Sequence, residues 1–218
     1  DAILGRIPGD WDITTSAHPE EVKQVFGHTI DTGLQHGTVT VMRDHIGYEI
    51  TTYRIDGEYE DGRHPKEVVF TAELREDLRR RDFTINAMAY SHETGIVDIF
   101  GGAEDLAARR IRCVGDAGER FTEDALRILR AVRFSAQLGF SIEKKTWQAL
   151  CELAPSLVHV SKERVQVELT KTLLSDRPEF IWKTEAAGLA PYISKTFPEV
   201  FAAWKKRKSC AMQSLEEK

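Results

Sequence analysis

The spacing of apolar positions changes once along this chain of 218 residues. Up to about Val114, β-branched and aromatic residues form short runs separated by glycine, proline and charged residues, a pattern typical of strands and turns. From Gly118 onward the apolar residues recur with a helical period. This change predicts a strand-containing domain followed by a region of helices alone, with a boundary near Val114 to Asp116.

The first half predicts a β-hairpin between residues 38–42 and 48–53, which are rich in threonine, valine and tyrosine. Alternation along its second strand places Glu49 on the face opposite to Ile50. The other elements predicted in this half are helices over 20–26 and around 74–78, strands over 95–100 and 111–114 with a small helix between them, and a mobile loop over 56–66.

The second half predicts a helix that Thr122 caps, with Glu123 and Asp124 in its first turn, where the helix dipole favours acids. Arg127 and Arg130 share a face of this helix with Glu123. Its expected core stripe is Ala125, Leu129, Val132 and Ala136. Further helices are predicted over 144–153, 161–174, 178–187 and 198–208.

A stretch near the start, Gly9-Asp10-Trp11-Asp12, carries two acids separated by one apolar residue. If it forms a strand, both carboxylates lie on the same face. Such a pair supplies oxygen ligands for Mg²⁺, and Glu49 supplies a third carboxylate if its strand lies alongside. The alternatives are a polar turn that leads into the helix over 20–26, and an ordinary surface position for Glu49.

Composition narrows the chemistry that this chain can carry. The net charge is -5, so it is not a uniformly basic nucleic-acid binder, although a local basic face is compatible with that total. Its three cysteines lack metal or disulfide spacing, which favours a reducing cytosol, and no apolar run is long enough to cross a membrane. The sequence contains no His-Glu-x-x-His, Gly-x-Ser-x-Gly or Walker motif, which leaves carboxylates and arginines to carry any chemistry.

Five motifs follow one another along residues 1–175: Gly5-x-x-x-Gly9-Asp10-x-Asp12, Arg80-Arg81-Asp82-Phe83-Thr84-Ile85-Asn86-Ala87, Phe100-Gly101-Gly102-x-x-Asp105-Leu106, Glu123-Asp124-x-Leu126-Arg127-x-x-Arg130 and Lys162-Glu163-Arg164-x-x-x-Glu168-Leu169. In this order and spacing they resemble the motifs of the bacterial class II tRNA nucleotidyltransferases, the CCA-adding enzymes, and of their relatives the bacterial poly(A) polymerases.

The resemblance implies an α/β nucleotidyltransferase head with a mixed β-sheet over residues 1–115, an all-α neck over 116–177 and the start of a helical body over 178–218. It implies a cytoplasmic enzyme that adds C and A to the tRNA 3′ end from CTP and ATP with Mg²⁺. No membrane partner is implied, and the oligomeric state stays open.

The same resemblance implies roles for individual residues. Asp10 and Asp12 become metal ligands, with Glu49 as a third catalytic carboxylate. Asp124 and Arg127 read the incoming base, because cytosine and adenine each present an exocyclic amine beside an unprotonated ring nitrogen. The other nucleotide-binding positions implied are Gly5, Arg81, Asp82, Asn86 and Arg130, and the implied RNA-binding positions are Lys162 and Arg164.

Compared with the family pattern, a Gly-Gly pair and an arginine are missing ahead of Asp1, so we expect further sequence upstream. The C-terminal regions that grip tRNA also look short. Three other readings stay open: a bacterial poly(A) polymerase, an enzyme that adds only CC or only A, and, from a different class, a noncatalytic nucleotide- or RNA-binding module.

Overall fold

The computed structural model describes residues 2–9, 11–57 and 68–204, which form two compact units, Asp1–Ala107 and Ala108–Lys218. We call them the head unit and the helical unit. The division falls a few residues before the boundary expected at 114–116. The reason is that residues 110–111 pair with a strand further along the helical unit.

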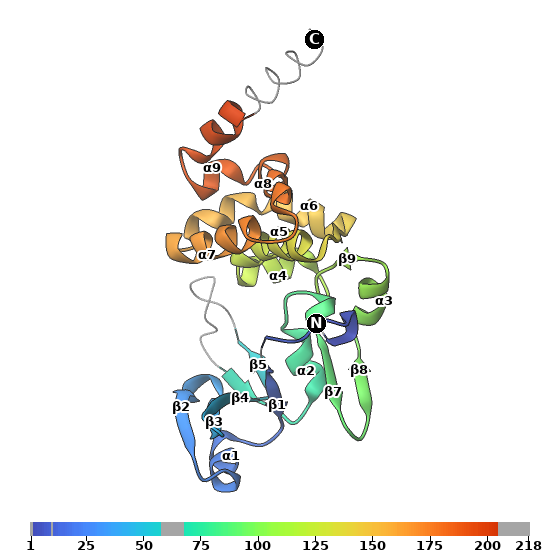
Figure 1. The fold of residues 1–218 in the computed structure, drawn as a ribbon, viewed down its shortest axis with the longest axis vertical. Coiled ribbons are helices and arrows are strands. Elements are labelled where there is room, and N and C mark those ends of the chain that lie inside the picture. The colour runs from blue at the N-terminus through green and yellow to red at the C-terminus, as the bar shows by residue number, and fades with distance from the viewer. Residues whose placement is uncertain (1, 10, 58–67, 205–218) are drawn as a thin grey trace. The chain divides into compact units, whose positions relative to one another are not determined.

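The head unit is a mixture of short strands and short helices (Figure 1). Its elements are the 3₁₀ turns η1 (Ala2–Leu4), η2 (Leu34–His36) and η3 (Thr84–Asn86), the helices α1 (Pro19–Val25), α2 (Leu74–Arg79) and α3 (Gly102–Ala107), and the strands β1 (Ile13–Thr15), β2 (Thr29–Gly33), β3 (Thr38–Arg43), β4 (Ile46–Thr52), β5 (Arg54–Asp56), β6 (Val68–Phe70), β7 (Met88–Ser91) and β8 (Gly95–Asp98).

The main sheet has the order β1-β4-β3-β2 and is mixed, as expected. The predicted hairpin is confirmed as β3 and β4, which pair antiparallel. Strand β1 runs parallel to β4, and Ile13 has Ile50 as its partner. Strand β2 adds to the far edge of the hairpin, although the sequence did not predict it.

The two faces of this sheet differ in chemistry because side chains alternate along each strand. On one face Val39, Val41 and Ile50 are buried and pack against Val22 of α1, which gives the sheet its core. The opposite face carries Glu49 and a set of hydroxyls from neighbouring strands, namely Thr14, Thr38, Thr40 and Thr51. One side of the sheet is therefore sealed and the other is polar.

Two small hairpins, β5–β6 and β7–β8, complete the strands of the head unit. Strand β8 confirms the strand predicted from Gly95, and α3 confirms the small helix that follows it. Both carboxylate oxygens of Asp98 accept 2.8 Å bonds from the amides of Gly102 and Ala103 at the start of α3. Most of the predicted loop over 56–66 lies outside the described residues.

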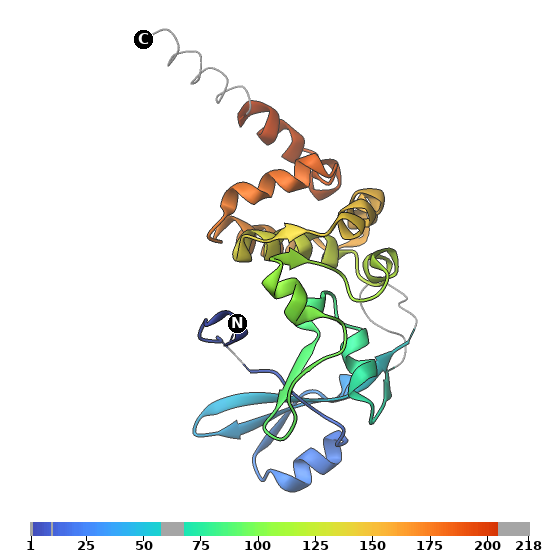
Figure 2. The same ribbon diagram turned by 90° about the vertical axis from the view of Figure 1, so that its right-hand side faces the viewer.

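The helical unit contains β9 (Arg110–Ile111), α4 (Ala117–Glu123), α5 (Leu126–Leu138), β10 (Ser141–Ile142), α6 (Lys144–Glu152), η4 (Ala154–His159), α7 (Lys162–Leu173), η5 (Pro178–Ile181), α8 (Trp182–Ala186) and α9 (Ala190–Ile193). Helix α5 is the centre of the unit and packs against α4 and α7 (Figure 2). The predicted core stripe of α5 is confirmed, since Ala125, Leu129, Val132 and Ala136 are all buried.

Two expectations for this unit were wrong. Strands do not stop at Val114, because Ser141 and Ile142 form a parallel pair with β9. Thr122 does not cap the helix that carries Arg127. Its hydroxyl donates to the carbonyl oxygen of Gly118 inside α4, and Asp124 closes α4 before α5 begins at Leu126. A break between two helices replaces the single helix start that the acids suggested.

The last described part of the chain begins the predicted body. The expected helix over 178–187 is divided into η5 and α8. Residues 197–204 are helical, and the basic end of the expected helix lies outside the described residues. The ring of Trp182 lies 4.5 Å from Phe201 and 4.7 Å from Trp204, which gives this part an aromatic core. No helix in the described ranges is long and apolar enough to cross a membrane.

The start of α3 tests how closely the head unit is packed. A Cβ atom at Gly102 would overlap the carbonyl oxygen of Thr84 and would lie 2.9 Å from Met88 Cγ. Gly102→Ala should therefore lower the free energy of unfolding by about 1 to 3 kcal/mol, the usual range for overpacking. Gly27→Ala is the matched control, because no heavy atom lies within 4 Å of its added Cβ. Urea unfolding of both variants makes the comparison, and equal stabilities would contradict this packing.

Candidate active site

The acidic positions of the head unit lie at equivalent points of two neighbouring strands. Asp12 directly precedes Ile13 and Glu49 directly precedes Ile50, and these isoleucines are partners in the parallel pair of β1 with β4. Both acids are exposed, and Glu49 lies on the polar face of the sheet. Within the described part of the chain neither carboxylate makes a hydrogen bond or ion pair. Asp10 lies outside the described residues.

This donor set fits a hard divalent cation. The groups gathered here are carboxylates and threonine hydroxyls, and oxygen ligands are what Mg²⁺ prefers. Three metal-ligating side chains do not meet anywhere among the described residues. That observation leaves the predicted trio open, because one of its three members, Asp10, is not described.

The segment after α2 is built around Asp82. This residue is buried, and its Oδ1 accepts bonds from the Phe83 amide at 2.8 Å and from Asn86 Nδ2 at 3.0 Å. The structure therefore brings together the predicted positions Asp82 and Asn86. The bond between them closes the turn that contains η3, so their first role in the structure is to shape the backbone that follows Arg81.

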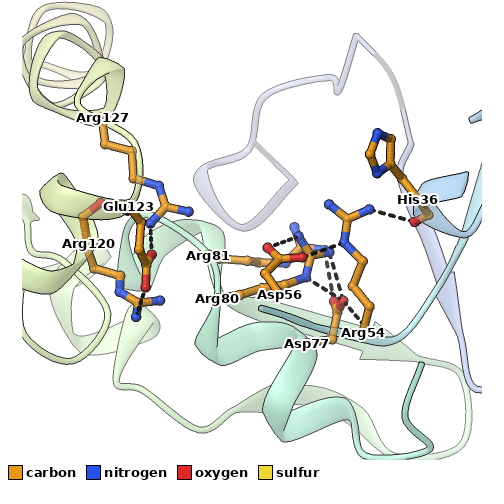
Figure 3. Close-up of polar contacts among 9 residues, drawn as sticks. All are labelled: His36, Arg54, Asp56, Asp77, Arg80, Arg81, Arg120, Glu123 and Arg127. Atoms are coloured by element: carbon orange, nitrogen blue, oxygen red, sulfur yellow. Dashed lines mark hydrogen bonds and ion pairs between the residues drawn. The ribbon is translucent and has the colours of Figure 1, made fainter. Parts of the chain in front are cut away.

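A cluster of charged side chains joins α2 to β5 (Figure 3). Asp77 is 0% exposed, and its Oδ1 accepts from Arg80 Nη2 at 2.8 Å and from Arg80 Nε at 3.0 Å. Its other oxygen, Oδ2, lies 3.5 Å from Arg81 Nη2. Burial raises the pKa of the neighbouring Tyr53 hydroxyl, and the charge of Asp77 raises it further.

On the strand side of this cluster, Asp56 lies between two arginines. Its Oδ1 is 3.0 Å from Arg54 Nε and its Oδ2 is 3.7 Å from Arg80 Nη1. Arg54 also donates from Nη1 to the carbonyl oxygen of His36 at 2.6 Å. The cluster thus connects β5, η2 and α2 through ion pairs that are mostly withdrawn from water (Figure 3).

In the helical unit, the predicted base-reading acid is held from both sides. Asp124 Oδ1 accepts from the Leu126 amide at 3.0 Å, which helps begin α5. Its Oδ2 accepts from Arg164 Nη2 of α7 at 2.8 Å. Sequence reasoning gave Arg164 an RNA-binding role, and the structure shows it paired with Asp124.

Arg127, the predicted base-reading donor, also has a fixed direction. Its Nη1 donates to Glu123 Oε2 at 2.6 Å and to the carbonyl oxygen of Arg120 at 3.1 Å (Figure 3). Arg120 pairs with the other oxygen of Glu123. Glu123 and Arg127 were expected on one helix, but they lie in α4 and α5 and meet across the break between these helices. Arg130 lies one turn further along α5, with its guanidinium 5.3 Å from the ring centre of Phe134.

Other predicted positions make local contacts. Gly5 has a positive φ of 70°, which glycine adopts without strain, and its amide donates to the carbonyl oxygen of Ala2. Lys162 Nζ donates to the carbonyl oxygen of Ile193 at 2.9 Å, so it ties α7 to the end of α9. RNA binding by Lys162 and Arg164 stays a prediction.

Two charged residues of the helical unit were not expected to meet. Arg133 of α5 and Glu168 of α7 are 7% and 4% exposed, and Arg133 Nε lies 2.5 Å from Glu168 Oε2. The only sequence signal for this pair was a charge in the middle of an otherwise apolar helical face. The cluster around Asp77 was also missed, although Asp77 precedes Arg80 and Arg81 by the three and four residues at which helical side chains meet.

Comparison with known proteins agrees with the motifs. Residues 1–112 match the family described as the Poly A polymerase head domain. Residues 139–199 match the family described as the probable RNA and SrmB-binding site of polymerase A. A CCA-adding enzyme of Leuconostoc mesenteroides subsp. mesenteroides is 55% identical over 177 residues, which cover 81% of this chain and 44% of that enzyme.

Solved structures show the same relationship. The Bacillus stearothermophilus CCA-adding enzyme in complex with CTP has a TM-score of 0.81 at 45% identity, covering 88% of this chain and 47% of that one. The Thermotoga maritima CCA-adding enzyme complexed with tRNA has a TM-score of 0.70 at 26% identity, covering 87% and 45% of the two chains. The chain spans about half the length of these relatives.

The fold is that of an α/β nucleotidyltransferase head followed by a helical region. The matched head domain takes in residues 1–112, about half of the 218 residues. The chain therefore belongs to the poly(A) polymerase head-domain family.

The buried ion pair of the helical unit generates a stability prediction. Arg133→Met leaves the Glu168 carboxylate buried and without this partner, which should lower the free energy of unfolding by about 3 to 5 kcal/mol. The double variant Arg133→Met/Glu168→Leu removes both charges and should recover most of that loss. Denaturant unfolding of the three proteins measures both effects. A double variant no more stable than the single one would contradict the pairing.

Proposed function

We propose that the protein of which this chain is part adds C and A to the 3′ end of tRNA from CTP and ATP, using Mg²⁺. The observation that carries the proposal is that Asp12, directly before β1, and Glu49, on the polar face of β4, precede the paired residues Ile13 and Ile50. The CTP and tRNA complexes of relatives with this fold support the choice of substrates. We place the reaction in the cytoplasm, and we assign residues 1–115, 116–177 and 178–218 to head, neck and body.

The acids of the polar face hold the cations in this proposal. Asp10, Asp12 and Glu49 supply charged oxygen ligands, and the buried core of β3, β4 and α1 supports the strand that carries Glu49. When bound, divalent cations lower the pKa of the attacking 3′-hydroxyl and neutralise the leaving pyrophosphate. The protein itself then needs only to orient the two substrates, and it forms no covalent intermediate.

The neck reads the base with one acceptor and one donor. Asp124 accepts from the exocyclic amine of cytosine or adenine, and Arg127 donates to the adjacent ring nitrogen. Uracil and guanine present the opposite pattern and would offer neither group a matching partner on the base. The contacts of Asp124 with Arg164, and of Arg127 with Glu123, support this role because they fix both side chains before a nucleotide binds.

The remaining assignments concern the ribose and the phosphates. Arg81 contacts the ribose, and Asp82 with Asn86 supports the backbone from which Arg81 projects. Arg130 meets phosphate, and Gly5 lets the backbone approach it closely. A poly(A) polymerase would use the same residues. The two functions differ in which nucleotides are added to the tRNA end: C and A in one case, and A alone in the other.

The metal ligands can be tested directly. Asp12→Asn should abolish nucleotide addition while leaving the fold intact, because an amide lacks the charge that holds the cations. Asp44→Asn is the matched control, since its side chain is 91% exposed in the β3–β4 turn, and it should keep full activity. The assay is extension of tRNA transcripts that end before or within CCA, followed by sequencing of their 3′ ends. Near-normal extension by Asp12→Asn would refute the assignment.

Base selection provides a second test. Arg127→Ala removes the donor to the ring nitrogen, a loss of about 1 to 3 kcal/mol for a buried hydrogen bond. Selection for C and A should relax accordingly and admit U or G, and Asp124→Ala should act in the same direction. The measurement is kcat/KM for all four nucleotides, with Arg177→Ala as a control whose side chain is 59% exposed. Uniformly lower activity with intact preference would contradict base reading.

A further inference from the structure

Asp77 has more partners than its place in α2 requires. Its side chain is 0% exposed, and the backbone amide of Arg54 donates to Oδ1 at 3.4 Å in addition to the two bonds from Arg80. A charged carboxylate so far from water is costly unless it is paired. Oxygen Oδ1 alone meets that need, and it ties α2 to β5.

The second oxygen of Asp77 faces a different group. Oδ2 lies 3.5 Å from Arg81 Nη2, close enough for an ion pair but without hydrogen-bond geometry. Within the described part of the chain, Asp77 Oδ2 and Arg81 Nε are both buried without a hydrogen-bond partner. A buried donor and acceptor are seldom left in this state, which indicates that Arg81 completes its bonds when something else binds.

The exposure of the arginines supports this view. The side chains of Arg54 and Arg80 are 17% and 20% exposed, whereas that of Arg81 is 29% exposed and is the most open of the three. Arg54 and Arg80 are also paired with Asp56, whereas Asp77 is the only side-chain partner of Arg81 within the described ranges. Arg81 is thus held through Nη2 by a carboxylate that is itself fixed in the cluster around Asp77 (Figure 3).

We propose that Asp77 is a positioning residue for ribose recognition: its Oδ2 orients the Arg81 guanidinium toward the ribose hydroxyls of the incoming nucleotide, while its Oδ1 anchors α2 to β5. The inference rests on the proposed function, which places the ribose at Arg81. It adds a residue that touches no substrate and acts only through Arg81. The charge of Asp77 is needed for this task, because a neutral amide cannot hold a guanidinium by an ion pair.

The test is the preference for ATP over 2′-deoxy-ATP, measured as dissociation constants by calorimetry. Asp77→Asn and Arg81→Ala should each lose one ribose contact. Their preference for ATP should therefore be about tenfold weaker than that of the wild-type protein, a change that corresponds to one hydrogen bond. The double variant should show no further reduction, because both changes remove the same contact. Asp77→Asn that folds and keeps the wild-type preference would overturn the proposal, as would a wild-type protein without preference.

Asp105→Asn is the matched control. Asp105 is also 0% exposed in the head unit, and its Oδ2 accepts from Thr84 Oγ1 at 2.6 Å instead of facing Arg81. Asp105→Asn should lower stability and leave the preference for ATP unchanged. If Asp105→Asn and Asp77→Asn lost the preference equally, Asp77 would have only a structural role and the proposal would be wrong. If Asp77→Asn does not fold, Asp77→Glu replaces it. That variant keeps the charge but displaces the guanidinium, and it should lose the same preference.

Failure of the proposed function would look different. If wild-type protein binds ATP with a ribose preference that Asp77→Asn loses, but transfers nothing to tRNA, nucleotide addition would be contradicted and the role of Asp77 would be supported. Wild-type protein that extends tRNA normally, with the preference unchanged in Asp77→Asn, would overturn the Asp77 proposal alone.

Discussion

The parallel pairing of β1 with β4 is the constraint on which the head unit depends. It aligns Ile13 with Ile50, the β4 residue that is buried with Val39 and Val41 against α1. Because side chains alternate, the same register leaves Asp12 and Glu49 at matching positions. A shift of β1 by one residue would move Asp12 away from the position that matches Glu49, so the register of this pair determines where the two acids lie.

Charged residues organise both units by pairing in places that water hardly reaches. In the head unit, Asp77 serves two elements through its two oxygens, one toward β5 and one toward Arg81. In the helical unit, Arg133 pairs with Glu168 between α5 and α7. Buried pairs of this kind contribute little net stability compared with apolar packing, but they tolerate few alternative arrangements. Such pairs fix the orientation of the arginine side chains that take part in them.

The proposed base-reading groups illustrate the same principle. Asp124 lies at the break between α4 and α5, where one oxygen helps begin the second helix and the other is held by Arg164. Arg127 is held by Glu123 in the preceding helix. Both groups reach their positions through contacts that exist without a nucleotide, so the entropy of orienting them is lost on folding and not on binding.

The sequence by itself determined the class of the fold, the hairpin β3–β4, the apolar stripe of α5 and the family, because alternation, helical period and motif spacing are local properties. It did not determine the pair β9–β10 or the break before α5, since two-residue strands and a local Asp124 bond carry almost no periodic signal. The partners of Arg133 and Arg164, and the contact of Asp77 with Arg54, were decided by tertiary structure alone. The sequence identifies which residues are charged. Which charged residues pair across two elements depends on how those elements pack together.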